Sequence, residues 1–476
     1  MRILHISAEC YPAAKAGGLG DVVGALPKYL SKAGTETGVV LPKYHTKWIL
    51  NQSFETVYQG VFYLHQEPVP FSIEREVTEV LGFPFFVANI PGKFDRPGVY
   101  MDEHNQPYSD ELRRSLSFQL AVLEWIKSME KRPSLLHCHD HHTALIPFFI
   151  NHAHAYQELR MLPTVFTIHN GEYHGSFGWE NLYLFPPYDM TMSGLLDWNK
   201  AINPLATAIK CCWKLTTVSP SYMQELQQSS NGLEGLLRNE ASKSQGILNG
   251  IDVQVWNPKT DKYLPHPLKR SVDKYKAENK AVLRERFNIN EGLPIVTFIG
   301  RLVGEKGADI IPHVVQLFMQ TDPKMGFVVL GTGEPRLHHA FTLLKQQFPG
   351  FFDVALEYNE GLAHTLYAGS DFLFMPSRVE PCGLNQMYGL RYGTIPIVRS
   401  VGGLRDTITD MSEEQGSGYR FDHFNVHEAN HALKRAAFLY EDQKAFKAVR
   451  KHIMSLDFSW ERSAATYQEI YESLIS

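Results

Sequence analysis

Residues 372–393 read FLFMPSRVEPCGLNQMYGLRYG, and this stretch predicts a strand, a turn and a helix in succession. The continuous apolar run Phe372–Met375 is typical of a strand buried on both faces. A helix that starts just after Gly383 would offer free N–H groups to an anion. Glu380 lies between the two elements, so the stretch predicts an anion site beside a carboxylate. Taken alone, an ordinary turn with a solvated glutamate explains it equally well.

The same alternation of apolar runs and helical patterns continues along the whole chain of 476 residues. A chain of this length exceeds one hydrophobic core and predicts two domains. The expected strands are 2–7, 38–41, 84–90, 135–138, 164–168 and 214–218, then 295–299, 326–330, 354–358, 372–375 and 395–398. A polar, proline-containing stretch at 249–276 predicts a linker. We therefore predict an α/β fold of two Rossmann-like, doubly wound domains that face a central cleft.

Composition excludes several classes of protein. The net charge of −5 gives no sign of nucleic acid or an anionic membrane as a partner. The chain begins with a short strand pattern rather than a signal peptide, and no apolar run is long enough to span a membrane. Its five cysteines form no C-x-x-C pair, which favours a reducing compartment. These features predict a cytoplasmic protein.

The loop after the first strand contains Lys15, Gly17, Gly18 and Gly20. A flexible basic loop at a helix start suits a phosphate. The glycine spacing matches neither G-x-G-x-x-G nor a P-loop. A plain tight turn therefore remains an equally good interpretation.

Histidines gather at the end of another expected strand, in the run HCHDHH at 137–142. His137 and His139 share a strand face, which would suit a metal, but no Glu-x-x-His or acidic cluster accompanies them. We expect no metal and expect these residues, with 167–173, to line a cleft. A buried, hydrogen-bonded histidine is the alternative at each position.

Two cations flank the loop after the strand at 295–299. Arg301 offers a bidentate fork and Lys306 a point charge, a suitable pair for a diphosphate. Surface salt bridges are the alternative. Gly331 and Thr332 end the next strand, and Tyr358 follows another, where it would stack on a base or pack in the core.

In order and spacing, these motifs resemble the bacterial glycogen synthases and plant starch synthases, which are retaining glucosyltransferases of the two-Rossmann-domain (GT-B) type. The resemblance is carried by 15–19, 94–100, 139–140, 165–170, 216–220, 246–252, 256–258, 300–302, 306–307, 330–333, 377–393 and 402–407. It implies an acceptor-side domain at 1–248, a sugar-nucleotide domain at 249–456, and a final helix at 457–476 that crosses back to the first.

The resemblance also implies roles for single residues. The catalytic residues would be Glu380, Arg301, Lys306, His169 and Asp140. The substrate-binding residues would be Lys15, Gly17, Gly18, Asp21, Asn249, Gly331, Thr332, Tyr358, Cys382, Gly383, Leu384 and Asn385. Lys15, Arg301, Lys306 and the helix start would hold the diphosphate, Tyr358 the base, and Asp140, His169 and Glu380 the glucose.

The implied reaction moves glucose from ADP-glucose, or UDP-glucose, to the 4-hydroxyl of an α-1,4-glucan with retention, without metal or cofactor. Glu380 would orient glucose hydroxyls rather than attack covalently. The chain departs from the family pattern at four places. Residues 203–208 lack the usual Lys-Gly-Gly, His141 replaces tryptophan, 170–175 differ, and Asn385 replaces threonine.

Other functions fit the sequence less well. A phosphorylase would need a lysine-bound pyridoxal phosphate, which no residue marks. A nicotinamide dehydrogenase would need G-x-G-x-x-G, which is missing. A non-catalytic glucan-binding protein on the same fold remains an alternative because of the four departures. Nothing in the sequence indicates an oligomeric state.

Overall fold

The computed structural model describes residues 1–103 and 106–475 and contains two compact units. The first unit combines Met1–Val218, Met223–Asn249 and Trp460–Ser476. The second unit combines Ser219–Tyr222 and Gly250–Ser459. No described helix has the length and apolar character needed to cross a membrane.

A nine-stranded sheet forms the centre of the first unit, in the order β11-β10-β7-β6-β1-β2-β5-β4-β3. The strands are β1 (Arg2–Ile6), β2 (Glu36–Pro42), β3 (Phe54–Leu64), β4 (Glu67–Glu76), β5 (Phe85–Asn89), β6 (Leu135–His139), β7 (Thr164–Ile168), β10 (Lys214–Thr217) and β11 (Ser244–Gly246). All pairs are parallel except β3–β4 and β4–β5. Because β1 lies between β2 and β6, the strand order reverses there, and ligands bind at such switch points.

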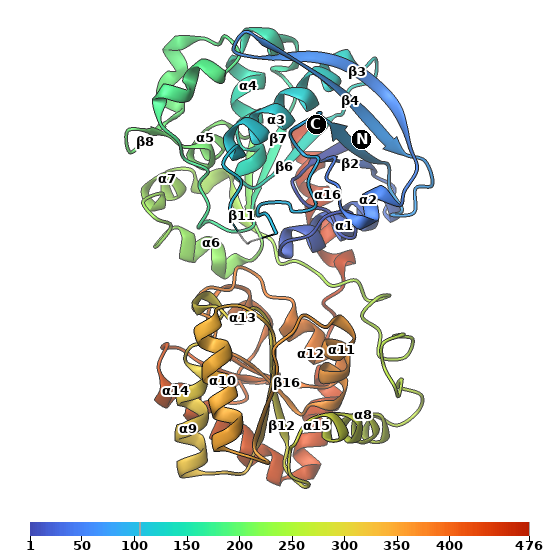
Figure 1. Cartoon of the computed structure of the whole chain (residues 1–476), viewed down its shortest axis with the longest axis vertical. Helices are drawn as coiled ribbons and strands as arrows, with labels where there is room; N and C mark the ends of the chain where they lie inside the picture. Colours follow the sequence, from blue (N-terminus) through green and yellow to red (C-terminus); the bar gives the residue numbers. More distant parts are fainter. Residues whose placement is uncertain (104–105, 476) are drawn as a thin grey trace. The chain divides into compact units, whose positions relative to one another are not determined.

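Helices surround this sheet (Figure 1). They are α1 (Gly18–Lys32), α2 (Lys47–Leu50), α3 (Glu111–Ser128), α4 (Ile146–His152), α5 (Pro204–Cys211), α6 (Pro220–Leu226), α7 (Glu234–Asn239) and α16 (Trp460–Ile475). A small ribbon of β8 (Asp197–Trp198) and β9 (Ala201–Ile202) lies apart from the sheet. Helix α16 packs beside α1 over β1, β6 and β7, in a core that includes Leu26, Trp460 and Tyr471. Apolar burial thus holds the last helix in the first unit.

The second unit contains a six-stranded, fully parallel sheet. Its strands are β12 (Ile295–Ile299), β13 (Gly326–Leu330), β14 (Phe352–Ala355), β15 (Phe372–Met375), β16 (Ile395–Arg399) and β17 (Tyr419–Phe421). The spatial order β14-β13-β12-β15-β16-β17 is third, second, first, fourth, fifth and sixth in chain order, which is the order of dinucleotide-binding sheets. The switch point therefore lies between β12 and β15.

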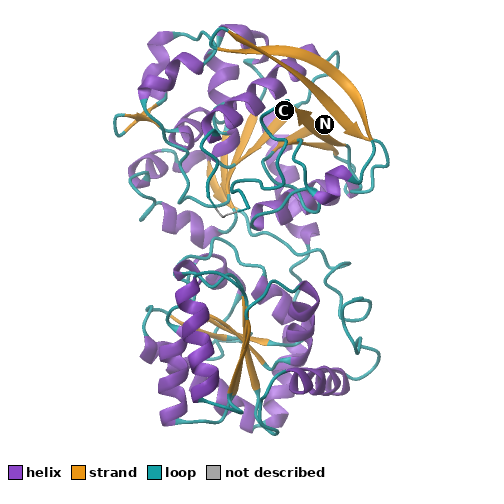
Figure 2. Cartoon of the chain, viewed as in Figure 1, coloured by secondary structure: helices purple, strands orange, loops and turns teal. Residues whose placement is uncertain are grey.

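Helices cover both faces of this second sheet (Figure 2). They are α8 (Val272–Arg286), α9 (Ile311–Thr321), α10 (Pro335–Gln347), α11 (Glu360–Gly369), α12 (Asn385–Tyr392), α13 (Gly402–Thr407), α14 (Val426–Glu441) and α15 (Gln443–Ile453). Helix α9 contacts both α10 and α14, and α11 contacts both α8 and α12, which gives two helical layers. The predicted α/β, doubly wound fold is confirmed.

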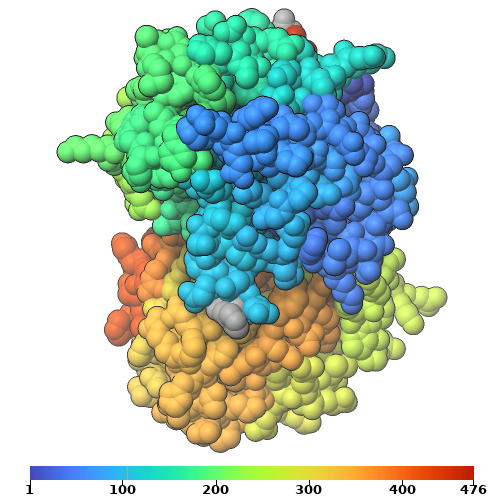
Figure 3. Space-filling model, turned by 45° about the horizontal axis from the view of Figure 1, so that its top comes forward, coloured from blue at the N-terminus to red at the C-terminus, as the bar shows by residue number. Residues whose placement is uncertain are grey.

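Continuous apolar runs locate most of the parallel strands. The expected strands at 164–168, 295–299, 326–330 and 372–375 coincide with β7, β12, β13 and β15. The expected strand at 354–358 exists but has the wrong bounds, because β14 begins at Phe352 and ends at Ala355, and Asn359 caps α11. The hairpin of β3 and β4 was not predicted. It lies on the surface of the first unit (blue in Figure 3), and β3 alternates weakly between exposed and half-buried residues.

Candidate active site

The loops after β12 and β15 lie side by side at the switch point, since these two strands pair directly. The backbone N–H of Arg378 donates to the carbonyl of Glu305 over 2.8 Å. The Arg378 guanidinium also donates two hydrogen bonds, of 2.6 and 2.8 Å, to the carboxylate of Asp309. A bidentate pair of this kind fixes geometry as well as charge. The two loops are therefore fastened to each other.

Lys306 and Glu380 meet between these loops. Lys306 Nζ lies 2.7 Å from Oε1 of Glu380, and Ser377 Oγ donates to Oε2 over 2.9 Å. Glu380 is buried, with 6% of its surface exposed, so both of its oxygens are held in place. The Lys306 side chain keeps 23% of its surface exposed and can still contact a ligand.

Arg301 and Tyr358 are the open side chains at this edge of the second sheet. The Arg301 side chain is 59% exposed, and its guanidinium contacts Glu305 over 3.4 Å. Tyr358 lies in the loop after β14 and is 83% exposed, so it does not pack in the core. The exposed Thr332 lies in the loop after β13, the strand between β12 and β14. Four of the expected ligand-binding residues thus lie at the same end of this sheet as Glu380, namely Arg301, Lys306, Thr332 and Tyr358.

The turn from Cys382 to Asn385 leads into α12. Gly383 has a φ of +71°, a conformation that glycine adopts without strain. Helix α12 begins at Asn385, and no side chain caps its N-terminus. Asn385 Nδ2 donates to the carbonyl of Ile299 over 2.7 Å. The residue that replaces threonine therefore ties the start of α12 to the end of β12.

Two glycines that follow β16, at the start of α13, pack against this turn. From the sequence, neither was assigned a role in the site. A Cβ on Gly402 would lie 2.0 Å from the Glu380 carbonyl oxygen, and one on Gly403 would lie 1.9 Å from that of Cys382. The Gly403 N–H donates to the Glu380 carbonyl over 3.1 Å. In the same way, a Cβ on Gly331 would lie 1.9 Å from the Gly300 carbonyl oxygen. These loops require glycine because their backbones touch.

In the first unit, a buried carboxylate organises the glycine-rich loop. Glu9 Oε2 accepts hydrogen bonds from the N–H groups of Ala16, at 2.6 Å, and Gly17, at 2.8 Å. Tyr100 donates to the other oxygen over 2.7 Å. The N–H of Gly17, expected to meet a diphosphate, therefore already has a protein acceptor. Glu9 was not predicted, although it begins the loop.

Lys15 pairs with Asp21 over 2.7 Å, so two of the predicted residues contact each other in this loop. Both side chains keep exposed surface, 39% and 25%. Gly18 is exposed at the start of α1, with open space where a Cβ would be. Asn249, at the end of the first unit, is buried, and its Oδ1 has no hydrogen-bond partner among the described residues.

Asp140 and His169 follow the neighbouring strands β6 and β7 and contact each other. Asp140 Oδ1 accepts the backbone N–H of His169 over 2.7 Å, and Asp140 has a φ of +54°. Burial raises the pKa of the Asp140 carboxyl to about 7. Burial lowers the pKa of His169 to about 3, so its imidazole is neutral at physiological pH. The structure thus brings together these two predicted residues.

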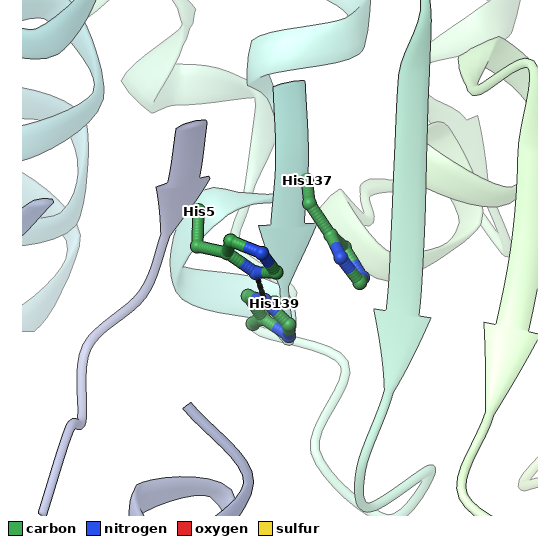
Figure 4. A group of neighbouring side chains, drawn as sticks. All are labelled: His5, His137 and His139. Atoms are coloured by element: carbon green, nitrogen blue, oxygen red, sulfur yellow. Dashed lines mark hydrogen bonds between the residues drawn. The ribbon is translucent and has the colours of Figure 1, made fainter. Parts of the chain in front are cut away.

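Behind His169, the histidines form a hydrogen-bonded chain. His169 Nε2 lies 3.0 Å from Nδ1 of His139, whose Nε2 lies 3.1 Å from Nδ1 of His5. Figure 4 shows His5, His137 and His139 close together on the neighbouring strands β1 and β6. His137 bonds to Tyr471 of α16 over 2.7 Å and to Thr167 over 2.6 Å.

This buried group does not fit a metal, although its ring nitrogens lie within 4.8 Å of one another. Both nitrogens of His137 and of His139 have hydrogen-bond partners, and the two rings stack at 4.1 Å. Only Nε2 of His5 has no partner among the described residues. The buried-histidine alternative therefore describes His137 and His139.

Two doubly wound units with cations and a held carboxylate at a switch point define a glycosyltransferase architecture. Residues 2–239 match the family model described as starch synthase catalytic domain, and residues 279–451 match that of group 1 glycosyl transferases. The chain belongs to the glycogen and starch synthase family and is a glycosyltransferase.

Individual relatives cover the whole chain. The glycogen synthase of Flavobacterium johnsoniae is 45% identical over 479 residues, covering 100% of this chain and 99% of the relative. That of Streptococcus gordonii is 38% identical and covers 100% of both. The catalytic domain of Arabidopsis thaliana starch synthase IV, solved with ADP and acarbose, superposes with a TM-score of 0.88 at 32% identity over 99% of both chains. Sucrose-phosphate synthase from Thermosynechococcus elongatus, at 16% identity and a TM-score of 0.62, shares the fold.

The glycine pair beneath Glu380 gives a first prediction. Gly403→Ala places a Cβ against the Cys382 carbonyl and must displace the turn that carries Glu380. We expect kcat for glucosyl transfer to fall on the order of 100-fold, as for a misplacement of about 1 Å in a catalytic group. Gly235→Ala is the matched control, because nothing lies within 4 Å of the added methyl. Equal activity of the two variants would contradict the close contact.

Proposed function

We propose that the chain transfers glucose from ADP-glucose to the non-reducing 4-hydroxyl of an α-1,4-glucan, with retention of configuration, in glycogen synthesis. The observation that carries this proposal is the Lys306–Glu380 pair at the switch point, beside the open Arg301 and the uncapped start of α12. The glycogen synthase relatives, and the starch synthase that was solved with ADP, support the donor and the acceptor.

The cations stabilise the negative charge of the leaving group. As the bond between glucose and diphosphate breaks, negative charge accumulates on the phosphate oxygens. Lys306 and the N–H groups at the start of α12 are fixed in place before the reaction, which is the condition for strong electrostatic stabilisation, and the exposed Arg301 adds a second cation. The departing diphosphate takes the proton of the attacking hydroxyl. The sugar can then be attacked on the face from which the diphosphate leaves.

Glu380 orients the glucose in this scheme rather than forming a bond to it. Its carboxylate is held by Lys306 and Ser377, and the ammonium group reduces its nucleophilicity. Strong acceptor oxygens held in this way suit glucose hydroxyls. Asp140 and His169 contribute to glucose binding from the first unit, where a hydrogen bond with His139 holds the His169 ring. Lys15 contributes positive charge toward the diphosphate.

The nucleobase is proposed to stack on Tyr358, whose ring is 83% exposed. Stacking accepts adenine and uracil alike. The preference for ADP-glucose therefore rests on the relatives rather than on this ring. The free and mostly buried cysteines agree with a reducing compartment, and we propose the cytoplasm.

A direct assay tests this function. The purified protein is incubated with a glycogen primer and either ADP-glucose or UDP-glucose that carries a radiolabelled sugar. We expect label in the polymer from ADP-glucose and less from UDP-glucose. The absence of incorporation from both donors would overturn the proposal, and preference for UDP-glucose would overturn the donor assignment.

Lys306→Ala removes the cation that contacts Glu380 and faces the diphosphate. We expect kcat to fall about 10²–10³-fold, as for the loss of one preorganised electrostatic contact. Lys324→Ala is the control, since Lys324 is 57% exposed and forms surface ion pairs. Thermal unfolding of both variants separates lost chemistry from lost folding. A stable Lys306→Ala protein with undiminished turnover would refute the phosphate role.

Tyr358→Ala removes the stacking ring. Base–aromatic stacking contributes about 1–3 kcal/mol, so we expect KM for ADP-glucose to rise about 5–150-fold with a much smaller change in kcat. Tyr358→Phe keeps the ring and should restore KM. Tyr63→Ala, which changes an exposed tyrosine on β3, is the control for a lost surface ring. An unchanged KM in Tyr358→Ala would exclude stacking.

A further inference from the structure

A second group of polar side chains lies at the start of α3 in the first unit. It consists of Glu111, the first residue of α3, with His141 and His142 from the short turn of helix that follows β6. Glu111 Oε1 lies 3.5 Å from Nε2 of His141 and 3.6 Å from Nε2 of His142. The three ligand atoms lie within 4.8 Å of one another.

The spacing of these atoms matches metal ligands, although Glu111 and His141 also form a long hydrogen bond of 3.5 Å. An N–H···O hydrogen bond places its heavy atoms about 2.7–3.2 Å apart, shorter than both contacts to Glu111. In a tetrahedral zinc site with bonds of about 2.0–2.2 Å, neighbouring ligand atoms lie about 3.3–3.6 Å apart. The contacts of 3.5 and 3.6 Å fall within that range.

The ring nitrogens of His142 are available to bind a metal ion. Both of its ring nitrogens are buried without a hydrogen-bond partner among the described residues. An unpartnered buried nitrogen destabilises the fold, and coordination of one ion would engage one of these two nitrogens. Its ring also stacks on Tyr100 at 4.8 Å, which limits its rotation.

His141 is held against the loop after β7. Gly175 backs the ring so closely that an added Cβ would lie 2.7 Å from Cδ2 of His141. Its surroundings therefore hold the His141 ring in place.

The chemistry of the group selects the metal. Two imidazoles and one carboxylate suit Zn²⁺, whereas Ca²⁺ and Mg²⁺ require oxygen ligands. The positive end of α3 and the nearby Arg114 oppose a cation. Arg114 donates to the carbonyls of Lys93, at 2.9 Å, and Val99, at 3.1 Å, which holds its guanidinium in place. A single carboxylate against these charges predicts moderate rather than tight affinity.

We propose that Glu111, His141 and His142 bind one Zn²⁺ ion, with water in the fourth position. The ion would join the start of α3 to the loop after β6, one residue from Asp140. This differs from the expectation of a metal-free protein, and from the buried His5–His137–His139 group, whose nitrogens are already engaged. The proposal concerns metal binding and does not depend on the glucosyl transfer reaction.

Equilibrium dialysis of the full-length protein against zinc chloride, after removal of metal with a chelator, tests this site. We expect one Zn²⁺ per chain, and X-ray absorption at the zinc edge should report nitrogen and oxygen ligands with two imidazoles. Glu111→Gln and His142→Gln should each weaken binding at least tenfold. His154→Gln, which changes an exposed histidine of the same unit, should leave binding unchanged.

Thermal unfolding provides a second readout. Zinc should raise the Tm of the unmodified chain and of His154→Gln but not that of Glu111→Gln, whose exposed side chain is not needed for folding. No stoichiometric zinc, sulfur ligands in the absorption spectrum, or equal affinity in Glu111→Gln and the unmodified chain would each overturn the proposal.

Discussion

The contact between Lys306 and Glu380 is the interaction on which the candidate active site depends. A carboxylate buried at the end of a sheet is stable only with a countercharge and hydrogen bonds, and losing one partner of such a pair costs about 3–5 kcal/mol. Lys306 and Ser377 supply both. The contact requires the loops after β12 and β15 to touch, and the segment after β16 packs against the same turn at Gly402 and Gly403. The ion pair therefore lies where three segments of the second unit meet.

In the first unit, the buried carboxylate of Glu9 has a role similar to that of Glu380. Its carboxylate accepts two backbone N–H groups of the glycine-rich loop and the hydroxyl of Tyr100, as Glu380 accepts Lys306 and Ser377. In each unit, a buried carboxylate near a switch point holds a glycine-containing loop in place next to exposed cations. Preorganisation of this kind lets positive charge act on a diphosphate without rearrangement.

The sequence predicts most of the parallel strands and the cations, since apolar runs and charged residues in loops are local signals, but it misses the short strands β11 and β17. It does not predict the exposed β3–β4 hairpin, whose weak alternation lacks a buried face. Nor does it predict Glu9, Gly403 or the Glu111 group, since their roles come from contacts between distant segments. From the sequence, Asn385 only lacks the hydroxyl of a threonine. In the structure, its side-chain amide donates a hydrogen bond to the carbonyl of Ile299. Long-range packing explains each of these differences.

A double-mutant cycle on Lys306 and Glu380 measures this central interaction most directly. Lys306→Ala, Glu380→Gln and the double variant are compared by kcat/KM for glucosyl transfer from ADP-glucose. If the two residues act as one unit, the double variant loses little more activity than the worse single variant. If the two losses simply multiply, Lys306 and Glu380 act independently, and the ion pair is not what organises the site.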